Sequence, residues 1–126
     1  MAAPPPWLIV QRGTAPILLL APHGGRRRDV RVPGQHKVND LHTGDVTREL
    51  ARLLGASVVI NEHLDRNDLD LNRSHQVRRD APWLLDVIAD LVGGMLVDAG
   101  RAVVLVIHGW NVSQVACDVG IGAREG

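Results

Sequence analysis

The feature that most constrains the fold is an alternation of short apolar runs with longer segments of helical periodicity. Apolar runs occupy residues 16–21, 57–60 and 102–107, and their length suits strands of a sheet that is buried on both faces. Between them lie two segments, 45–54 and 82–99, that are typical of helices. The order strand–helix–strand–helix–strand predicts an α/β fold, with a mainly parallel sheet flanked by helices.

The first helical segment, residues 45–54, predicts an amphipathic helix. Thr43 or Asp45 can cap its start, and Gly55 can end it. Apolar side chains recur at the spacing of one helix face. We expect this face to be buried; it consists of Val46, Leu50, Leu53 and Leu54.

The second helical segment spans residues 82–99. Asp80 is a plausible N-cap, Pro82 suits the first turn, and Gly100 can stop the helix. Gly93-Gly94 weakens its middle, so the sequence allows a kink or break there. The expected buried stripe is Leu84, Val87, Ile88, Leu91 and Met95.

The remaining segments are less regular. Residues 1–6 contain three consecutive prolines and are expected to form a mobile lead, followed by a short strand at residues 7–10. Residues 61–80 are mostly polar and predict a long loop, which is often functional. Residues 102–107 are the clearest buried strand.

Composition limits the classes of protein to which this chain can belong. With 126 residues the chain fits one small domain over residues 1–126, complete or incomplete. Zero net charge argues against a nucleic-acid partner, and the longest apolar run is too short to span a membrane. The single cysteine, Cys117, excludes an internal disulfide framework and is compatible with a cytoplasmic location.

Two histidines follow two of the predicted strands. His23 comes after the run 16–21, and His108 comes after the run 102–107. Ligands of parallel sheets bind beyond the carboxyl ends of the strands, so we expect the two imidazoles to converge there. Two histidines and a carboxylate, with one position left for water, are a common ligand set of hydrolytic zinc.

The acidic partner of these histidines is open. Asp29, Asp40 and Asp45 all lie between the first histidine and the first helix, and His42 could replace them as a third imidazole. Each aspartate also has an ordinary interpretation, because Asp45 can cap the helix and Asp40 can begin a turn. The residues alone therefore leave the third ligand undecided.

The polar segment 61–80 contains a pair suited to gripping a carboxylate. The stretch Leu69-Asp70-Leu71 leads directly into Asn72 and Arg73. An amide beside a planar guanidinium can bind a substrate carboxylate at two points. Arg66 could add a second positive group or could form a surface ion pair with a neighbouring aspartate.

These motifs occur in a recognisable order. They are Pro22-His23-Gly24-Gly25, the segment Asp40–Asp45, Arg66 with Leu69–Arg73, and His108 followed by Asp118–Gly126. In this order the chain resembles the N-formylglutamate amidohydrolase family over about residues 16 to 126. The wider group includes zinc carboxypeptidases and aspartoacylase-like amidohydrolases.

The resemblance implies a zinc-peptidase-like (phosphorylase/hydrolase-like) α/β fold and a zinc-dependent hydrolase. The substrate would be a small carboxylate, an N-acyl amino acid such as an N-formylglutamate-like compound, with hydrolysis at its amide bond. His23 and His108 would hold Zn²⁺ with an acidic residue, for which Asp45 is the best match and Asp40 the second. Binding of the substrate carboxylate would fall to Arg66, Asn72 and Arg73.

The sequence departs from the pattern of these families at three points. Arg26 stands where the carboxypeptidase branch has a glutamate, and Gly109 follows the second histidine where serine is usual. Members of the family also continue beyond the length of this chain, and in the carboxypeptidase-like branch that part carries the general base. No convincing substitute is found among Glu49, Glu62 and Glu125.

Two further hypotheses stand beside the hydrolase. The chain could be a catalytically inactive module that binds a metal or a carboxylate, or a fragment of a longer enzyme whose histidines belong only to the fold. A sheet edge left open in a fragment would favour a homo-oligomer or aggregation.

Overall fold

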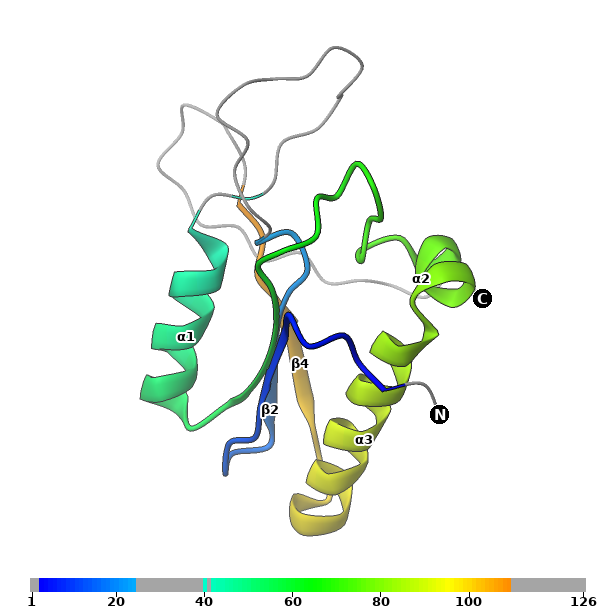
Figure 1. The fold of residues 1–126 in the computed structure, drawn as a ribbon. Coiled ribbons are helices and arrows are strands. Elements are labelled where there is room, and N and C mark those ends of the chain that lie inside the picture. Colours follow the sequence, from blue (N-terminus) through cyan, green and yellow to red (C-terminus); the bar gives the residue numbers. More distant parts are fainter. Residues whose placement is uncertain (1–2, 25–39, 41, 110–126) are drawn as a thin grey trace, which may run out of the picture.

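The computed structural model describes residues 3–24, 40 and 42–109, drawn in colour in Figure 1. Residues 25–39, which include the candidate ligand Asp29, and residues 110–126 lie outside the described residues. The described part contains four strands and three helices. In chain order they are β1 (Leu8–Gln11), β2 (Ile17–Ala21), α1 (Thr43–Leu54), β3 (Ser57–Asn61), α2 (Ser74–Asp80), α3 (Pro82–Ala99) and β4 (Val103–Val106).

The four strands form one mixed sheet in the order β1-β3-β2-β4. β2 pairs in parallel with both β3 and β4, with Leu19 opposite Val58 on one side and Leu105 on the other. β1 pairs antiparallel with β3 at the other edge. The predicted α/β class is confirmed, and the carboxyl ends of β2, β3 and β4 lie at the same end of the sheet.

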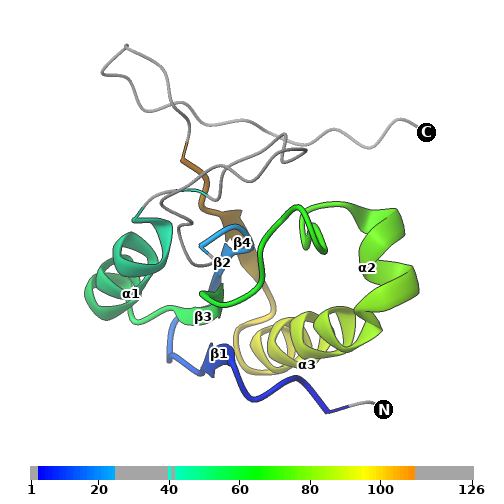
Figure 2. The same ribbon diagram turned by 45° about the horizontal axis from the view of Figure 1, so that its top comes forward.

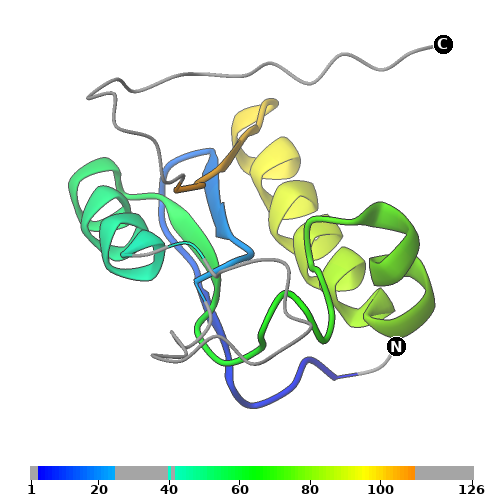
Figure 3. The same cartoon turned by 90° about the horizontal axis from the view of Figure 1, so that it is seen from above.

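The helices form a layer on each face of this sheet. Figure 1 shows α1 on one face and α3 on the other, and Figure 3 shows the same layers from above. Under α1 lies a cluster that includes Leu19, Val58 and Ile60, and under α3 lies a larger cluster around Leu18 and Val59. Successive residues of β2 and β3 therefore face opposite clusters, as the alternation of a strand requires.

The prediction that residues 102–107 form a buried strand was correct in type and wrong in burial. β4 is an edge strand, and its four residues Val103 to Val106 are 42–48% exposed. The reason is that α1 packs on β2 and β3, and α3 packs on β2, so neither helix covers β4. An apolar run of this length cannot by itself distinguish a central strand from an edge strand.

The predicted apolar face of α1 was also wrong. The helix buries Thr43, Gly44 and Thr47 against the sheet, and only Leu50 of the predicted face packs into the core. The other three members of that face are exposed: Val46, Leu53 and Leu54.

The ends of α1 follow the prediction at one terminus only. The helix begins after His42, a non-glycine residue with φ of 62°, and neither Thr43 nor Asp45 acts as its N-cap. It ends at Gly55, which has φ of 66°, as the sequence predicts. The left-handed conformation of His42 turns the chain sharply from Asp40 into the helix.

Two predictions near the second helix need correction. Residues 74–80, expected to be part of a loop, form α2, which is anchored by buried Val77. Asp80 is the last residue of α2, so Ala81 and not Asp80 occupies the N-cap of α3. α3 itself runs from Pro82 to Ala99 as one element through both glycines, and Gly100 ends it as predicted.

None of the helices in the described part of the chain combines the length and the apolar character that crossing a bilayer requires.

Candidate metal centre

His23 is placed by the end of β2. It follows the last residue of the strand by two positions, and its side chain is almost fully buried. Gly24 follows it, and a Cβ on Gly24 would lie 2.8 Å from the carbonyl oxygen of Asn61, so only glycine allows this approach to the end of β3. The tight contact between the two strand ends holds the His23 backbone at the edge of the sheet.

Asp40 is tied to His23 through the backbone. The Asp40 N–H donates to the His23 carbonyl at 2.8 Å, and the Thr43 hydroxyl donates to the Asp40 carbonyl at 3.2 Å. The Asp40 side chain is buried, with one carboxylate oxygen, Oδ2, 3.5 Å from Nδ1 of His23. The sharp turn at His42 and this backbone bond together aim Asp40 at the first histidine.

His108 joins from the end of β4. The Ile107 N–H donates to the Leu20 carbonyl at 2.7 Å, which continues the pairing with β2 up to the residue before His108. Nδ1 of His108 lies 3.0 Å from Oδ2 of Asp40, and the Gly109 N–H donates to the same oxygen at 3.1 Å. The His108 ring lies 5.1 Å from that of His23 and is about one-third exposed, so the cluster opens to solvent on this side.

Together, His23, Asp40 and His108 form a group that could hold a metal ion. One ligand atom from each lies within 4.8 Å of the others. Nδ1 of His23 is buried and has no hydrogen-bond partner among the described residues, although it faces the Asp40 carboxylate. Such an orphaned atom is unfavourable unless it binds something. Two imidazoles and one carboxylate with an open side also match the donor set of hydrolytic zinc.

Asp70 fixes the orientation of the His23 ring. Nε2 of His23 lies 2.6 Å from Oδ1 of Asp70, and both side chains are buried. Burial by itself would raise the pKa of the Asp70 carboxyl. Hydrogen bonds from His23 and from the Asn72 N–H, with the charge of Arg66, outweigh burial and leave that pKa below its ordinary value. An ionised Asp70 keeps the proton of His23 on Nε2 and leaves Nδ1 as an acceptor.

Arg66 lies between the two buried carboxylates. Its Nη1 is 3.3 Å from Oδ1 of Asp40, and its Nη2 is 3.9 Å from Oδ2 of Asp70. This contact occupies one oxygen of Asp40 and leaves the other for the histidines.

The sequence-predicted ligands separate into two groups. His23 and His108 lie together, and they meet Asp40, which the sequence ranked second among the acids. The Asp45 side chain is 82% exposed on the first turn of α1, where its Oδ1 lies 3.7 Å from Nη1 of Arg48. Asp45 therefore does not belong to the described cluster.

The residues expected to bind a carboxylate differ in their surroundings. Arg66 contacts Asp40 and Asp70, as described above, whereas the Arg73 side chain is about half exposed, with Nε 3.7 Å from Oδ2 of Asp70. The Asn72 N–H donates to Oδ1 of Asp70 at 2.9 Å, and Asn72 is an exposed residue. Of the three, Arg73 and Asn72 are the more exposed residues beside the cluster.

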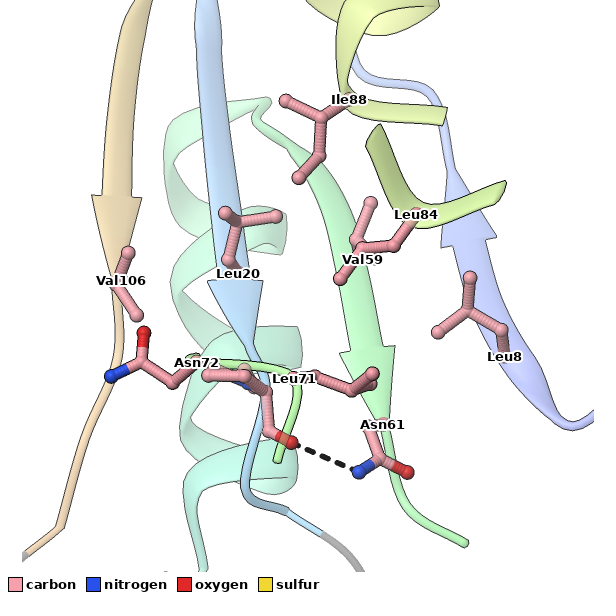
Figure 4. Close-up of a pocket in the computed structure, with 11 residues that line it drawn as sticks. Leu8, Leu20, Val59, Asn61, Leu71, Asn72, Leu84, Ile88 and Val106 are labelled. Carbon is pink, nitrogen blue, oxygen red and sulfur yellow. Dashed lines mark hydrogen bonds between the residues drawn. The ribbon is translucent and has the colours of Figure 1, made fainter. Parts of the chain in front are cut away.

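The Asn72 side chain reaches a small cavity between the sheet and α3. Figure 4 shows it beside Leu71 and Val106, with Leu20, Val59 and Ile88 farther along the cavity. The cavity holds about 50 Å³ and is lined mainly by apolar side chains. Pro22, next to His23, also lines it, so this apolar space begins close to the metal cluster.

Sequence reasoning missed two residues that build the site. Asp70 was considered only as part of an alternating pattern, although a metal-binding histidine usually donates its second N–H to a carboxylate, and this rule could have identified it. Asn61, at the end of β3, donates to the carbonyls of Pro22 and Leu64, at 2.9 Å each, and accepts from the Leu64 N–H. It therefore fixes the residue before His23 and the start of the polar segment (Figure 4).

Comparisons of this chain with protein-family models, with curated proteins and with solved structures found no match. The fold and site define the chain as an α/β protein with a candidate His-Asp-His metal centre. Its resemblance to N-formylglutamate amidohydrolases remains a prediction from the sequence motifs.

Proposed function

We propose that His23, Asp40 and His108 bind a zinc ion, and that the chain belongs to a zinc-dependent hydrolase of amide bonds in N-acyl amino acids. The observation that carries the proposal is the buried, unpartnered Nδ1 of His23, which faces a carboxylate and a second imidazole. Asp70 supports it, because its bond to Nε2 leaves this Nδ1 in the form that binds metals.

The metal would supply the reactive chemistry. A zinc ion in this donor set provides a water-derived nucleophile near neutral pH and polarises a carbonyl group. The chain's own residues then have distinct tasks. His23 and Asp40 form the buried side of the site, and His108 forms its exposed side, from which substrate would enter.

The carboxylate of the substrate would be held by Arg73 with Asn72. The Arg73 side chain is about half exposed and follows the residue whose backbone N–H bonds Asp70, so it lies beside the cluster and within reach of solvent. A planar guanidinium binds a carboxylate at two points, which would fix the amide bond of the substrate relative to the metal. Arg66 has a different task in this account, because it supports Asp40.

A metal- or carboxylate-binding module without catalysis is the second candidate. It is favoured because Glu62, the glutamate nearest to the end of β3, pairs with Arg48 of α1 and does not belong to the metal cluster. Within the described residues, the group around His23 and His108 includes no glutamate that could act as a general base.

Hydrolysis of N-acyl amino acids separates these two candidates. The purified, zinc-loaded chain would be incubated with N-formyl and N-acetyl derivatives of glutamate, aspartate and leucine, and release of the free amino acid would be measured. The hydrolase proposal predicts turnover that a chelator removes and added zinc restores. Bound zinc with no turnover on any of these substrates would leave the binding module.

A further inference from the structure

The β4 end of the molecule exposes an apolar surface that continues over three elements. β4 itself consists of Val103 to Val106, and all four residues are exposed although the strand has no polar side chain. A strand that is apolar on both faces is typical of the interior of a sheet with layers on both sides. Here no helix of the described residues covers either face of β4.

The outer edge of β4 also has free backbone groups. The Val103 N–H donates to Pro16 and the Ile107 N–H donates to Leu20, so alternate residues face β2. The N–H groups of Val104 and Val106 therefore point to the opposite side, where the described residues supply no strand. Such an edge is a template for pairing with another strand.

α1 turns an apolar flank toward this edge. Arg48 bonds Glu62 after β3, and a Cβ on Gly44 would also meet Glu62, so both residues face the β3 side. Val46 lies two residues from both Gly44 and Arg48, which is a rotation of roughly 200° about the helix axis from each of these residues. Val46, and Leu53 two turns later, therefore lie on the flank toward β4.

α3, on the opposite face of the sheet, also turns an apolar flank toward β4. Trp83 contacts Trp7 before β1, and Gly94 lies near Arg12 after β1, so both face the β1 side. Leu85 and Leu96 each follow one of these residues by two positions and so lie on the opposite flank, toward β4. Figure 2 shows β4 at the end of the sheet, with a helix on each face and no helix of the coloured, described residues beyond it.

We infer that this surface, which we call the β4 patch, is the interface between two copies of the chain. The patch consists of Val46, Leu53, Leu85, Leu96 and Val103–Val106. Its eight residues are between 42% and 64% exposed. Their exposed surface is on the order of 600 Å², against about 800 Å² per partner in a standard interface.

A second copy fits the patch better than a single peptide strand does. A lone strand would pair with Val104 and Val106 but would leave the flanks of α1 and α3 in water. A second copy would bring its own β4, together with the apolar flanks of its α1 and α3 on the two sides of that strand. Related by a two-fold axis, the two β4 strands would pair antiparallel and join both sheets into one, with like surfaces in contact. None of the eight patch residues is charged, and Glu49, which lies between Val46 and Leu53 on the α1 flank, is paired with Arg52 at 2.6 Å.

The experiment compares two neighbouring substitutions on α3. Leu96 is in the patch, whereas Val97 is 86% exposed and lies about 100° away around the helix. Sedimentation equilibrium of the whole chain should show a dimer. Leu96→Lys should weaken it by at least about tenfold, because a charge buried in an apolar interface is costly, and Val97→Lys should leave it unchanged.

Hydrogen exchange at Val104 and Val106 gives a second measurement, for the case that Leu96→Lys fails to fold. Their amides should be protected in the dimer and should exchange faster on dilution. A parent chain that is monomeric at all concentrations would overturn the inference, as would a dimer that Leu96→Lys and Leu85→Lys both leave intact. Protection of both amides in a monomer would also overturn it and would assign the patch to other segments of the chain.

Discussion

Nε2 of His23 and Oδ1 of Asp70 lie 2.6 Å apart in a buried environment, 47 residues from each other in the chain. This bond joins the end of β2 to the polar segment before α2. Because Asp70 also accepts the Asn72 N–H and lies 3.7 Å from Nε of Arg73, it connects the candidate metal ligands with the residues proposed to bind substrate. The pair is therefore the structural link between the two halves of the site.

Asp70→Asn tests this link. The substitution keeps the shape of the side chain but removes the charge that holds the proton of His23 on Nε2. We expect zinc affinity to fall about 10- to 100-fold, as for other partners of metal-binding histidines. Competition with a chromogenic chelator would measure it. Asp68→Asn, an exposed acid two residues earlier, is the matched control, and an unchanged affinity in Asp70→Asn would remove Asp70 from this role.

The identity of the acidic ligand can be tested with two aspartates. Asp40→Asn should abolish stoichiometric zinc binding, because the Asp40 carboxylate faces both histidines. Asp45→Asn should retain zinc, because its side chain is exposed beside Arg48. Elemental analysis of both variants after gel filtration would measure their zinc content. Zinc retained in Asp40→Asn and lost in Asp45→Asn would restore Asp45 as the ligand.

Arg73→Ala separates substrate binding from metal binding. Its guanidinium is half exposed and does not contact the ligand atoms, so zinc should stay bound. We expect KM for N-acyl amino acids to rise, by about tenfold or more if a two-point contact is lost, with a smaller change in kcat. Steady-state kinetics would measure both. Loss of zinc, or an unchanged KM, would contradict the carboxylate role.

The Arg48–Glu62 ion pair predicts a specific pH dependence of stability. The hydrogen bond from Arg48 lowers the pKa of Glu62, partial burial raises it, and the charge of Arg48 lowers it again, with a net decrease. Because the pKa of Glu62 is lower in the folded chain, the ion pair's contribution to the free energy of unfolding is fully present above the ordinary glutamate pKa, about 4.3. This contribution is lost as the pH falls through the lower pKa that Glu62 has in the folded chain.

Denaturant unfolding of the parent, Arg48→Gln and Glu62→Gln chains between pH 3 and 7 would test this pH dependence. The stabilisation by the ion pair should be lost below about pH 4.3. The parent should be more stable than either variant at neutral pH, by about 0.2–1 kcal/mol for a largely exposed pair, and the difference should shrink in acid. A double variant should be no less stable than the single ones. A difference that is constant across the range would show that the pair does not cause it.

Local patterns predicted most elements because each carries its own signal. Gly55 and Gly100 end α1 and α3 as expected, since both adopt the left-handed conformation that glycine permits. Helix α2 was missed because only Val77 marks its buried side, which is too little for a periodic pattern. The type of an element is thus local, whereas the burial of its faces depends on the neighbouring elements, as β4 and Val46 show.

The candidate site also combines residues that the local sequence predicts with residues whose position depends on the tertiary structure. His23 and His108 could be predicted because each ends an apolar strand, and parallel strands bring their ends together. Asp40 could not be separated from Asp45, because the choice depends on the backbone bond from Asp40 to His23 and on the sharp turn at His42. These are tertiary features that no spacing in the sequence encodes.

The most direct test of the central claim is the metal content of the purified chain, measured by elemental analysis beside His23→Ala and His108→Ala. The account predicts near-stoichiometric zinc in the parent and its loss in both variants, while circular dichroism shows that the fold remains. A parent chain that holds no metal after zinc is supplied, or variants that keep it, would contradict the proposed metal centre.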